Sequence, residues 1–212
     1  MDALEQSAPE LILFGGSFDP IHYGHLFIAE AACVLRKADR VVFLPTRTPH
    51  HRQELRASAE HRAAMVRTAI ASNPHFALDV SDLDPTASGY SIDLLPRLRR
   101  MYPGTRFSFL VGEDSLTASP WHAFNEVVAL LDHFLVAPRR EAASDLSRIQ
   151  AFLAAQEPQT RAKIELLEQP RMTISASAIR ASLAQAGSIR YLVPEGVQRY
   201  IVEHKLYGQL DV

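Results

Sequence analysis

The chain has 212 residues, of which 47% are hydrophobic and 22% charged, so its composition is that of a globular protein and excludes a disordered or collagen-like chain. Its 22 lysines and arginines nearly balance its 24 aspartates and glutamates, which argues against a nucleic-acid coat protein or a polybasic membrane binder. The single cysteine, Cys33, excludes a disulfide framework and a cysteine-based zinc site within one chain.

Both ends of the chain are expected to be short tails. Residues 1–10 are polar and acidic, without the apolar stretch of a signal peptide, and we expect them to be flexible. No run in the sequence approaches the roughly 18 apolar residues of a membrane span. These features and the single cysteine favour a cytoplasmic protein. We expect one domain over residues 11–207 and a second tail over 208–212.

Short apolar runs alternate along the chain with segments of helical periodicity. The run over 11–14 stops at two glycines, as a buried strand does before a turn, and the helical pattern from His25 ends at 36–37 with two cations, which suit a helix C-terminus. The predicted strands cover residues 11–14, 41–44, 76–80, 106–111, 133–137 and 164–167. The predicted helices cover residues 25–37, 59–71, 91–101, 121–131, 145–155, 177–185 and 194–204.

This alternation predicts the fold class. Strands that alternate with helices imply right-handed crossovers, so we predict a Rossmann-like α/β fold with an open, mostly parallel sheet and helices on both faces. Residues from about 175 to 207 should form a small C-terminal helical part. Residues 46–57 are polar and basic without apolar periodicity, and long loops in compact domains are usually functional or disordered. Ser58 is expected to cap the helix that follows them.

The first strand is followed by a segment with the features of a phosphate site. Ligands of open parallel sheets bind beyond the carboxyl ends of the strands, and the first such end carries GGSFDPIHYGH over 15–25. Two glycines allow the backbone to approach a ligand closely. His22 and His25 lie at the start of the first helix, where unpaired N–H groups attract anions. Their imidazoles could donate hydrogen bonds to phosphoryl oxygens during phosphoryl or nucleotidyl transfer.

Structural interpretations of the same segment compete with this one. Two glycines after a strand often form only a tight turn, and a histidine near a helix start is more often a cap or a core residue. The His-x-x-His spacing suits zinc, but no third ligand follows at ligand spacing. The segment matches neither a phosphate loop nor a Gly-x-Gly-x-x-Gly fingerprint. From the residues alone, a phosphate site and a structural turn are about equally supported.

The run over 15–25 resembles the Gly-Gly-Thr/Ser-Phe-Asp-Pro-x-His-x-Gly-His signature of the nucleotidylyltransferase superfamily, which joins a nucleoside monophosphate from ATP or CTP to a phosphorylated acceptor. A second segment, TISASAIR over 173–180, resembles the Ile-Ser-Ser-Thr-x-Ile-Arg motif of that superfamily, with two alanines where the motif can carry hydroxyls. Ser175 or Ser177 would cap a helix with Arg180 in its first turn, so that hydroxyl, N–H and guanidinium groups converge on one anion. The alternative is a capped helix with a surface arginine.

Four further segments resemble bacterial nicotinate-nucleotide adenylyltransferases. They are TPHHR over 48–52, GYSIDLL over 89–95, GEDSL over 112–116 with Trp121 after it, and IRYLVPE over 189–195. Three positions depart from the family pattern, with His50 for proline, Gly89 for serine and Leu94 for threonine. The resemblance runs from about residue 11 to 207, and ordered motifs over that length are far more specific than any one of them.

The resemblance implies a reaction in NAD biosynthesis. AMP would pass from ATP to nicotinate mononucleotide, giving deamido-NAD (nicotinate adenine dinucleotide) and pyrophosphate, when the acceptor's 5′-phosphate attacks the α-phosphorus in line. No protein nucleophile is implied. Mg²⁺ would accompany ATP and be held mainly by substrate phosphates, so no protein metal site is expected. The partners would be ATP and nicotinate mononucleotide, without nucleic acid or membrane, and the protein could be a monomer or a homodimer.

The resemblance also implies site residues at matching positions. The implied catalytic residues are His22, His25 and Arg180. The implied ATP-binding residues are these three and Gly15, Gly16, Ser17, Phe18, Gly112, Asp114 and Ser177. The implied substrate-binding residues are His51, Arg52, Tyr90, Ser91, Trp121 and Arg139.

Several of these residues also have a simpler interpretation. His51 and Arg52 could belong to a solvated basic loop. Pro138 departs from the local family pattern next to Arg139, which argues against a substrate contact there. Trp121 could stack on the pyridine ring, although core packing is the commoner fate of a tryptophan. Backbone N–H groups at Tyr90–Ser91 could bind the nicotinate carboxylate and so favour the acid over the amide.

Two other functions remain as alternatives. One is the same fold with another acceptor, namely nicotinamide mononucleotide, phosphopantetheine or a polyol phosphate; Trp121 and the GYS segment over 89–91 argue against the last two. The other is a nucleotide-binding regulatory module that has lost turnover. The presence of His22, His25 and Arg180 together argues against such a module.

Overall fold

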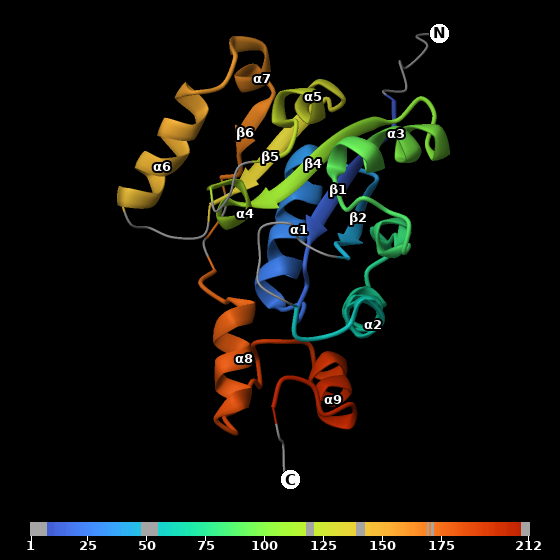
Figure 1. Ribbon diagram of the computed structural model, residues 1–212, viewed down its shortest axis with the longest axis vertical. Helices are drawn as coiled ribbons and strands as arrows, with labels where there is room; N and C mark the ends of the chain where they lie inside the picture. Colours follow the sequence, from blue (N-terminus) through green and yellow to red (C-terminus); the bar gives the residue numbers. More distant parts are fainter. Residues whose placement is uncertain are drawn as a thin grey trace, which may run out of the picture.

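A six-stranded parallel sheet forms the centre of the molecule (Figure 1). The computed structural model describes residues 8–47, 55–117, 121–138, 143–168, 170 and 172–208, which leaves most of the two predicted tails outside. The strands are β1 (Glu10–Gly16), β2 (Arg40–Pro45), β3 (Phe76–Leu78), β4 (Arg106–Gly112), β5 (His133–Ala137) and β6 (Ile164–Leu166). Their order in the sheet is β3-β2-β1-β4-β5-β6, and every neighbouring pair is parallel.

This order places a topological switch point between β1 and β4. The chain builds outward from β1 through β2 to β3, then returns to β4 on the other side of β1 and continues to β6. At such a point the connections leave in opposite directions, and a crevice opens beyond the carboxyl ends of the two central strands. The predicted parallel α/β fold is therefore confirmed, and the GGSFDPIHYGH segment follows one of the two strands that form the switch point.

Helices cover both faces of the sheet. They are α1 (Tyr23–Arg36), α2 (Ala59–Ile70), α3 (Ser91–Met101), α4 (Glu113–Thr117), α5 (Phe124–Ala129), α6 (Ala143–Ala154), α7 (Pro158–Ala162), α8 (Ala176–Ala184) and α9 (Glu195–Glu203), with a 3₁₀ turn at Ser81–Leu83. In Figure 1, α8 and α9 lie beyond the carboxyl ends of the strands, with α8 below α1 and α9 below α2. The predicted C-terminal helical part is thus on the side of the sheet where ligands bind.

The two faces carry separate hydrophobic cores. Along β1 the side chains alternate: Ile12 and Phe14 join the core under α1, α2, α8 and α9, and Leu11 and Leu13 join the core under α3 and α5. This alternation is the period-two geometry of a strand. A strand buried on both faces is apolar at most positions, which explains why the strands read as nearly continuous apolar runs in the sequence.

The structure shortens or adds several elements. The helix predicted over 121–131 covers only 124–129, because Ala123 has a φ of 52° in the left-handed region and cannot continue a helix toward residue 121. The strand predicted to reach residue 80 ends at Leu78, where the Asp79 carboxylate accepts from the backbone N–H of Ser81 and turns the chain. The short helices α4 and α7 and the 3₁₀ turn were not predicted, since three to five residues show no periodicity.

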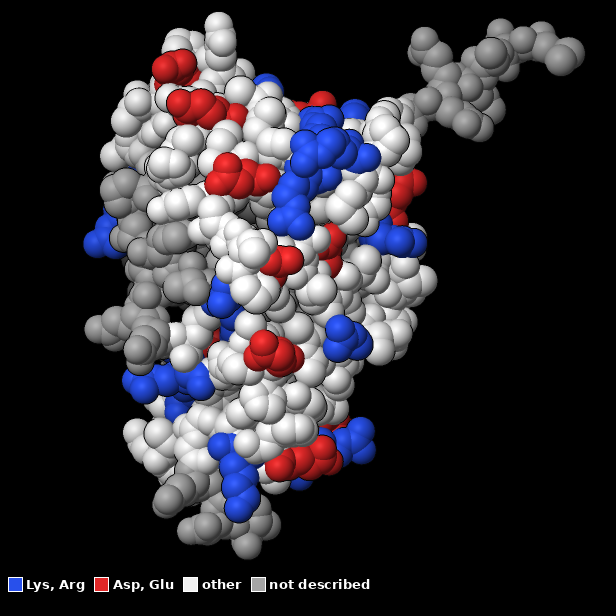
Figure 2. Space-filling model, turned by 45° about the vertical axis from the view of Figure 1, so that its right-hand side comes forward, with Lys and Arg blue, Asp and Glu red and all other residues white. Residues whose placement is uncertain are grey.

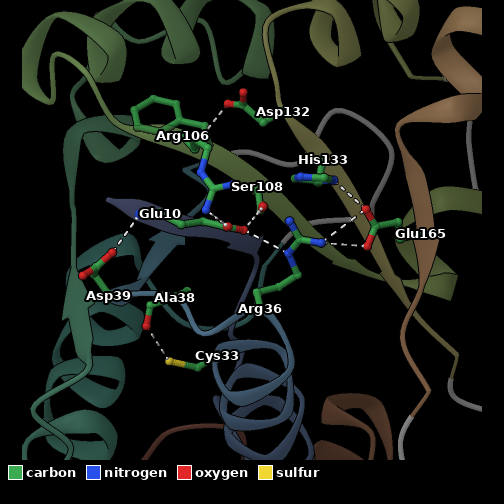
Figure 3. Close-up of polar contacts among 11 residues, drawn as sticks. Glu10, Cys33, Arg36, Ala38, Asp39, Arg106, Ser108, Asp132, His133 and Glu165 are labelled. Carbon is green, nitrogen blue, oxygen red and sulfur yellow. Dashed lines mark hydrogen bonds and ion pairs between the residues drawn. The ribbon is translucent and has the colours of Figure 1, made fainter. Parts of the chain in front are cut away.

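A buried ion network lies at the opposite, amino-terminal edge of the sheet (Figure 3). Glu10 is only 2% exposed, and its carboxylate accepts from Ser108 Oγ at 2.6 Å and from Arg36 Nε at 3.0 Å. Arg106 Nη2 lies 3.0 Å from the same carboxylate. Arg36 also pairs with Glu165. These contacts join β1, α1, β4 and β6 at the edge away from the predicted site.

The surface is mixed in charge. Figure 2 shows basic and acidic side chains interspersed over one face, with a larger basic group near the top of the view. Within the ranges that the structure describes, no helix is long and apolar enough to cross a membrane.

Candidate active site

The last two residues of β1 are glycines that lie close to neighbouring aromatic rings. A Cβ atom on Gly15 would lie 3.1 Å from the Phe109 ring, and one on Gly16 would lie 3.0 Å from the Phe18 ring. Both glycines still pair with β2, so the turn begins at Ser17 rather than at Gly15 as predicted. Phe18 has a φ of 48° and a fully buried ring that packs edge-on against His25, with 5.1 Å between ring centroids. The ring of Phe18 therefore supports His25, and only the backbone at this position could face a ligand.

The two histidines cap α1 and each other. His22 is the N-cap residue; its Nδ1 accepts from the backbone N–H of His25 at 3.3 Å, and His25 Nδ1 accepts from the backbone N–H of His22 at 3.3 Å. The rings stack with centroids 3.7 Å apart, and Gly24 is needed because a Cβ there would lie 3.0 Å from the His22 ring. α1 begins at Tyr23, two residues earlier than predicted.

This reciprocal cap assigns the tautomer of both imidazoles. A ring nitrogen that accepts an N–H carries no proton, so in the neutral rings of His22 and His25 the proton is on Nε2. Each ring then carries its Nε2–H donor on the edge opposite its capping nitrogen; His22 is fully buried, whereas His25 is only partly buried. The capping interpretation and the phosphate interpretation of the sequence are thus compatible, because they use different nitrogens.

Arg180 reaches the same loop from the far end of the chain. Its Nη1 donates to the carbonyl oxygen of Asp19 at 2.6 Å, across 161 residues of sequence. Ser175 is the cap of α8, since its Oγ accepts from the backbone N–H of Ala178 at 3.2 Å, so Arg180 begins the second helical turn rather than lying in the first. Ser177 lies exposed in the first turn, with its Oγ 3.2 Å from that of Ser175. The structure therefore brings the two motifs of the sequence together.

Three residues that sequence reasoning missed hold this arrangement in place. Asp19 is 2% exposed, and its carboxylate accepts from two backbone N–H groups of residues 56–57 and from Tyr207 Oη at 2.7 Å. Arg62 is fully buried and donates to the carbonyl oxygens of Ser17 at 2.7 Å and Arg47 at 3.2 Å. Burial lowers the pKa of the Arg62 guanidinium, an effect that nearby Asp19 opposes. Burial raises the pKa of Tyr207, with the negative charge of Asp19 adding to it.

A sequence signal existed for one of these residues. Arg62, Val66 and Ile70 are spaced by four residues, and all three are buried on one face of α2. An arginine on the apolar stripe of a helix must find hydrogen-bond partners inside the protein, so it is a candidate for a structural or functional contact. For Tyr207 the sequence offers no such local signal.

The N-terminus of α3 borders a hollow of about 300 Å³. Tyr90 is the N-cap residue and Ser91 the first helical residue, as predicted. The backbone N–H of Tyr90 donates to Ser88 Oγ at 3.2 Å. The Tyr90 ring lies 4.4 Å from the ring of His122, which places this helix end beside the segment that carries Trp121.

The Trp121 side chain packs against the hydrophobic core, which is the simpler interpretation that the sequence offered. Its Nε1–H donates to the carbonyl oxygen of Ser115 at 2.8 Å, and its ring contacts Phe109, Phe124 and Phe134 edge-on. The residue as a whole is only partly buried. Packing and contact with a ligand therefore do not exclude each other here.

The remaining predicted residues divide into two groups. Gly112 ends β4, and Asp114 lies in α4 directly after it, at the carboxyl end of the strand next to β1. His51, Arg52 and Arg139 lie outside the described residues.

The donors that converge on the β1 loop do not form a metal site. They are imidazole and guanidinium N–H groups, whereas Mg²⁺ takes oxygen ligands, and the Asp19 carboxylate already accepts three hydrogen bonds. Among the described residues no group of three or more His, Cys, Asp or Glu side chains could hold a metal ion. The arrangement is suited to an anion with several oxygens.

Comparison with known families agrees with this geometry. The sequence model of the cytidylyltransferase-like family matches residues 13–182, a range that includes both the β1 loop and Arg180. The fold and this match define the chain as a nucleotidyltransferase.

Relatives narrow the assignment. The chain is 38% identical over 197 residues to a probable nicotinate-nucleotide adenylyltransferase of Symbiobacterium thermophilum, covering 92% of this chain and 93% of the relative. It is 40% identical over 204 residues to one of Thermomicrobium roseum, covering 94% and 92%. The chain belongs to the nicotinate-nucleotide adenylyltransferase family.

A solved structure shares the fold. Nicotinic acid mononucleotide adenylyltransferase of Plasmodium falciparum, complexed with NaAD, superposes with a TM-score of 0.70 at 21% sequence identity. The match covers 94% of this chain and 97% of the other. It supports the architecture described above, including the C-terminal helical part, within the covered length.

Proposed function

We propose that this enzyme transfers the adenylyl group of ATP to nicotinate mononucleotide, giving nicotinate adenine dinucleotide and pyrophosphate in NAD biosynthesis. The names of the relatives supply the acceptor. The observation that carries the proposal is the 2.6 Å hydrogen bond from Arg180 to the Asp19 carbonyl, because it puts a guanidinium beside the loop that ends in two oriented imidazoles.

The chemistry needs no protein nucleophile. An oxygen of the acceptor's 5′-phosphate forms a bond to the α-phosphorus of ATP, the bond from that phosphorus to the bridging oxygen of the β-phosphate breaks, and pyrophosphate leaves with the electron pair. Negative charge builds up on the oxygens around the α-phosphorus. Donors positioned for that charge are typically worth about 10²–10³ in rate each.

The residues of the β1 loop are assigned to the phosphates. The Nε2–H groups of His22 and His25 would donate to the α-phosphoryl oxygens, and backbone at Gly15, Gly16 and Ser17, with that of Phe18, would lie against ATP. Arg180 and Ser177, from the first two turns of α8, would bind the triphosphate and the departing pyrophosphate. Gly112 and Asp114, across the switch point, are assigned to the nucleoside, with Asp114 on a ribose hydroxyl.

The acceptor is assigned to the N-terminal end of α3. The N–H of Ser91 is one of the first-turn donors that a helix leaves without an intrahelical partner, and it would bind the nicotinate carboxylate. Because the Tyr90 N–H donates to Ser88, Ser91 is the better candidate of the two. The exposed surface of Trp121 would contact the pyridine ring. His51 and Arg52 are proposed as phosphate contacts, and Arg139 as a substrate contact, on their sequence positions alone.

Mg²⁺ is proposed to enter with ATP and to neutralise charge on its phosphates. No step is assigned to contacts between the protein and the metal. We also propose that the enzyme acts in the cytoplasm, with its one cysteine reduced. Light scattering on the purified chain would distinguish the monomer from the homodimer.

Pyrophosphate release with ATP and each acceptor tests the proposed function. Because a helix N-terminus favours an anion, we expect kcat/KM for nicotinate mononucleotide to exceed that for nicotinamide mononucleotide by about tenfold or more. Equal values of kcat/KM would contradict the binding of the nicotinate carboxylate at the N-terminus of α3, but not the type of reaction. Pyrophosphate release with phosphopantetheine, but with neither nicotinate nor nicotinamide mononucleotide, would show that the enzyme uses another acceptor. ATP binding without release with any acceptor would indicate a regulatory module.

A further inference from the structure

Asp19 connects three parts of the chain that are far apart in sequence. Its carboxylate accepts from the backbone N–H groups of Arg56 at 2.8 Å and Ala57 at 3.1 Å, where the polar loop returns to α2. The same carboxylate accepts from Tyr207 Oη at 2.7 Å, after α9. Its backbone carbonyl accepts from Arg180 of α8 at 2.6 Å. One residue therefore contacts the loop after β2 and both segments of the C-terminal part.

Asp19 lies close to a proposed catalytic residue, so its contacts can affect the reaction. Asp19 stands three residues before His22, in the turn that leads from β1 into α1. The turn is also held by Arg62, which donates to the Ser17 carbonyl. Asp19 thus anchors the turn before His22 through its carboxylate and holds the guanidinium of Arg180 at its carbonyl oxygen.

Tyr207 is itself held in an uncommon conformation. Its φ is 70°, in the left-handed region that non-glycine residues seldom adopt, and its ring is packed against the core under α1 and α2. Such a conformation persists where the surroundings fix it. The Tyr207 hydroxyl makes a partly buried hydrogen bond to a carboxylate, and hydrogen bonds to charged groups are stronger than neutral ones.

We propose that Asp19 is a positioning residue: by joining the turn before His22 to Tyr207 and to Arg180, it sets the geometry between the imidazoles and the guanidinium. This inference rests on the proposed function. Asp19 does not touch substrate; it acts through His22 and Arg180. Tyr207 is the remote partner through which the C-terminal part acts on the turn.

The test is a double-mutant cycle on kcat. Tyr207→Phe removes one hydroxyl and keeps the ring, so the chain should fold, and kcat at saturating ATP and acceptor should fall about tenfold, since small misplacements of catalytic groups lower rates strongly. In a His22→Ala background the same substitution should lower kcat by a clearly smaller factor, because one of the groups it positions is gone. Tyr191→Phe is the matched control, because Tyr191 is 81% exposed, and it should leave kcat unchanged.

Asp19→Asn supplies the second variant. An amide keeps the size of the carboxylate but puts an NH₂ group against N–H and O–H donors, so we expect a larger fall in kcat, about 100-fold, with thermal unfolding measured alongside. The inference is overturned if Tyr207→Phe lowers the melting temperature but leaves kcat within twofold, or if it lowers kcat by the same factor in both backgrounds. If Asp19→Asn does not fold, the Tyr207 cycle still decides.

The wild-type assay separates this inference from the proposed function. Absence of pyrophosphate release with nicotinate mononucleotide in the wild type contradicts the proposed acceptor. The cycle is then run with the acceptor that the enzyme does use, since the geometry of the phosphate site is common to all of them.

Discussion

At the scale of single residues, the two histidines of the β1 loop cap a helix and are also the proposed donors to the phosphates. In each ring Nδ1 accepts a backbone N–H of the helix start, which fixes the ring plane and the position of the proton on Nε2. A donor that is oriented before substrate arrives does not have to reorganise during the reaction, and this preorganisation is the source of its effect on rate.

His25→Ala tests this division between the two nitrogens. Because the variant loses a donor to the transition state, we expect kcat to fall about 10²–10³-fold in the pyrophosphate assay. It also loses half of the reciprocal cap, so the free energy of unfolding in urea should fall by only about 1 kcal/mol. His75→Ala is the control, since His75 is exposed and lies outside the β1 loop. A variant with near-normal kcat would make His25 a structural residue.

The single cysteine predicts a dependence of stability on pH. Burial raises the pKa of the Cys33 thiol, and the negative charges of Glu30 and Asp39 raise it further. The folded chain therefore keeps the thiol proton at pH values where the unfolded chain has lost it. The stabilisation is complete below the usual thiol pKa of 9.0 and is lost as pH rises through the raised value.

Urea unfolding of the wild type and Cys33→Ala, each at pH 7 and about pH 10, measures this effect. We expect the free energy of unfolding to fall more between the two pH values in the wild type than in the variant. The comparison with the variant removes the contribution of Tyr207, whose raised pKa acts in the same direction. Equal falls in the two proteins would show that Cys33 does not contribute.

At the scale of elements, the two serines at the start of α8 have different roles. The sequence left open which of them caps the helix, and the structure assigns the cap to Ser175. Ser175→Ala should lower the free energy of unfolding by about 1 kcal/mol. Ser177→Ala should leave stability unchanged and raise KM for ATP, because this hydroxyl is exposed in the first turn and assigned to phosphate. Urea unfolding and steady-state kinetics on both variants measure the difference; the reverse pattern would contradict both assignments.

The elements themselves were largely predictable, for a physical reason. Parallel strands are buried on both faces, so each appears as a nearly continuous apolar run, and the longer helices show their period. The β1 loop was predictable as a site because its glycines, its histidines and a helix start are neighbours in sequence. The hydrogen bond from Tyr207 to Asp19 was not, because it spans 188 residues and the sequence around Tyr207 carries no sign of this partner. Which residue of the C-terminal segment contacts the β1 loop is decided by tertiary packing alone.

At the scale of the whole molecule, the two edges of the sheet have separate roles. The carboxyl edge carries the candidate active site, and the amino edge carries the ion network around Glu10. A buried carboxylate with two guanidinium partners stabilises the fold only while all of them are present, since removal of one leaves the others uncompensated.

Glu10→Gln separates stability from activity. We expect the free energy of unfolding to fall by about 3 kcal/mol, because the partly buried Arg36 and Arg106 lose their shared counter-charge. Glu165→Gln should cost about 1 kcal/mol or less, since the Glu165 side chain is 38% exposed. Below its melting temperature Glu10→Gln should retain wild-type kcat. Loss of kcat at full folding would show that the two edges are coupled.

The contact between Asp19 and Tyr207 also sets an order of events during synthesis. A ribosome that has just made the β1 loop must add 188 more residues before the partner of Asp19 exists. The sheet can form its first strand pairs well before that, but the turn ahead of His22 lacks its last anchor until residue 207 emerges. On the proposed role of Asp19, the β1 loop therefore reaches its final geometry, and the enzyme its full rate, only after residue 207 has been added.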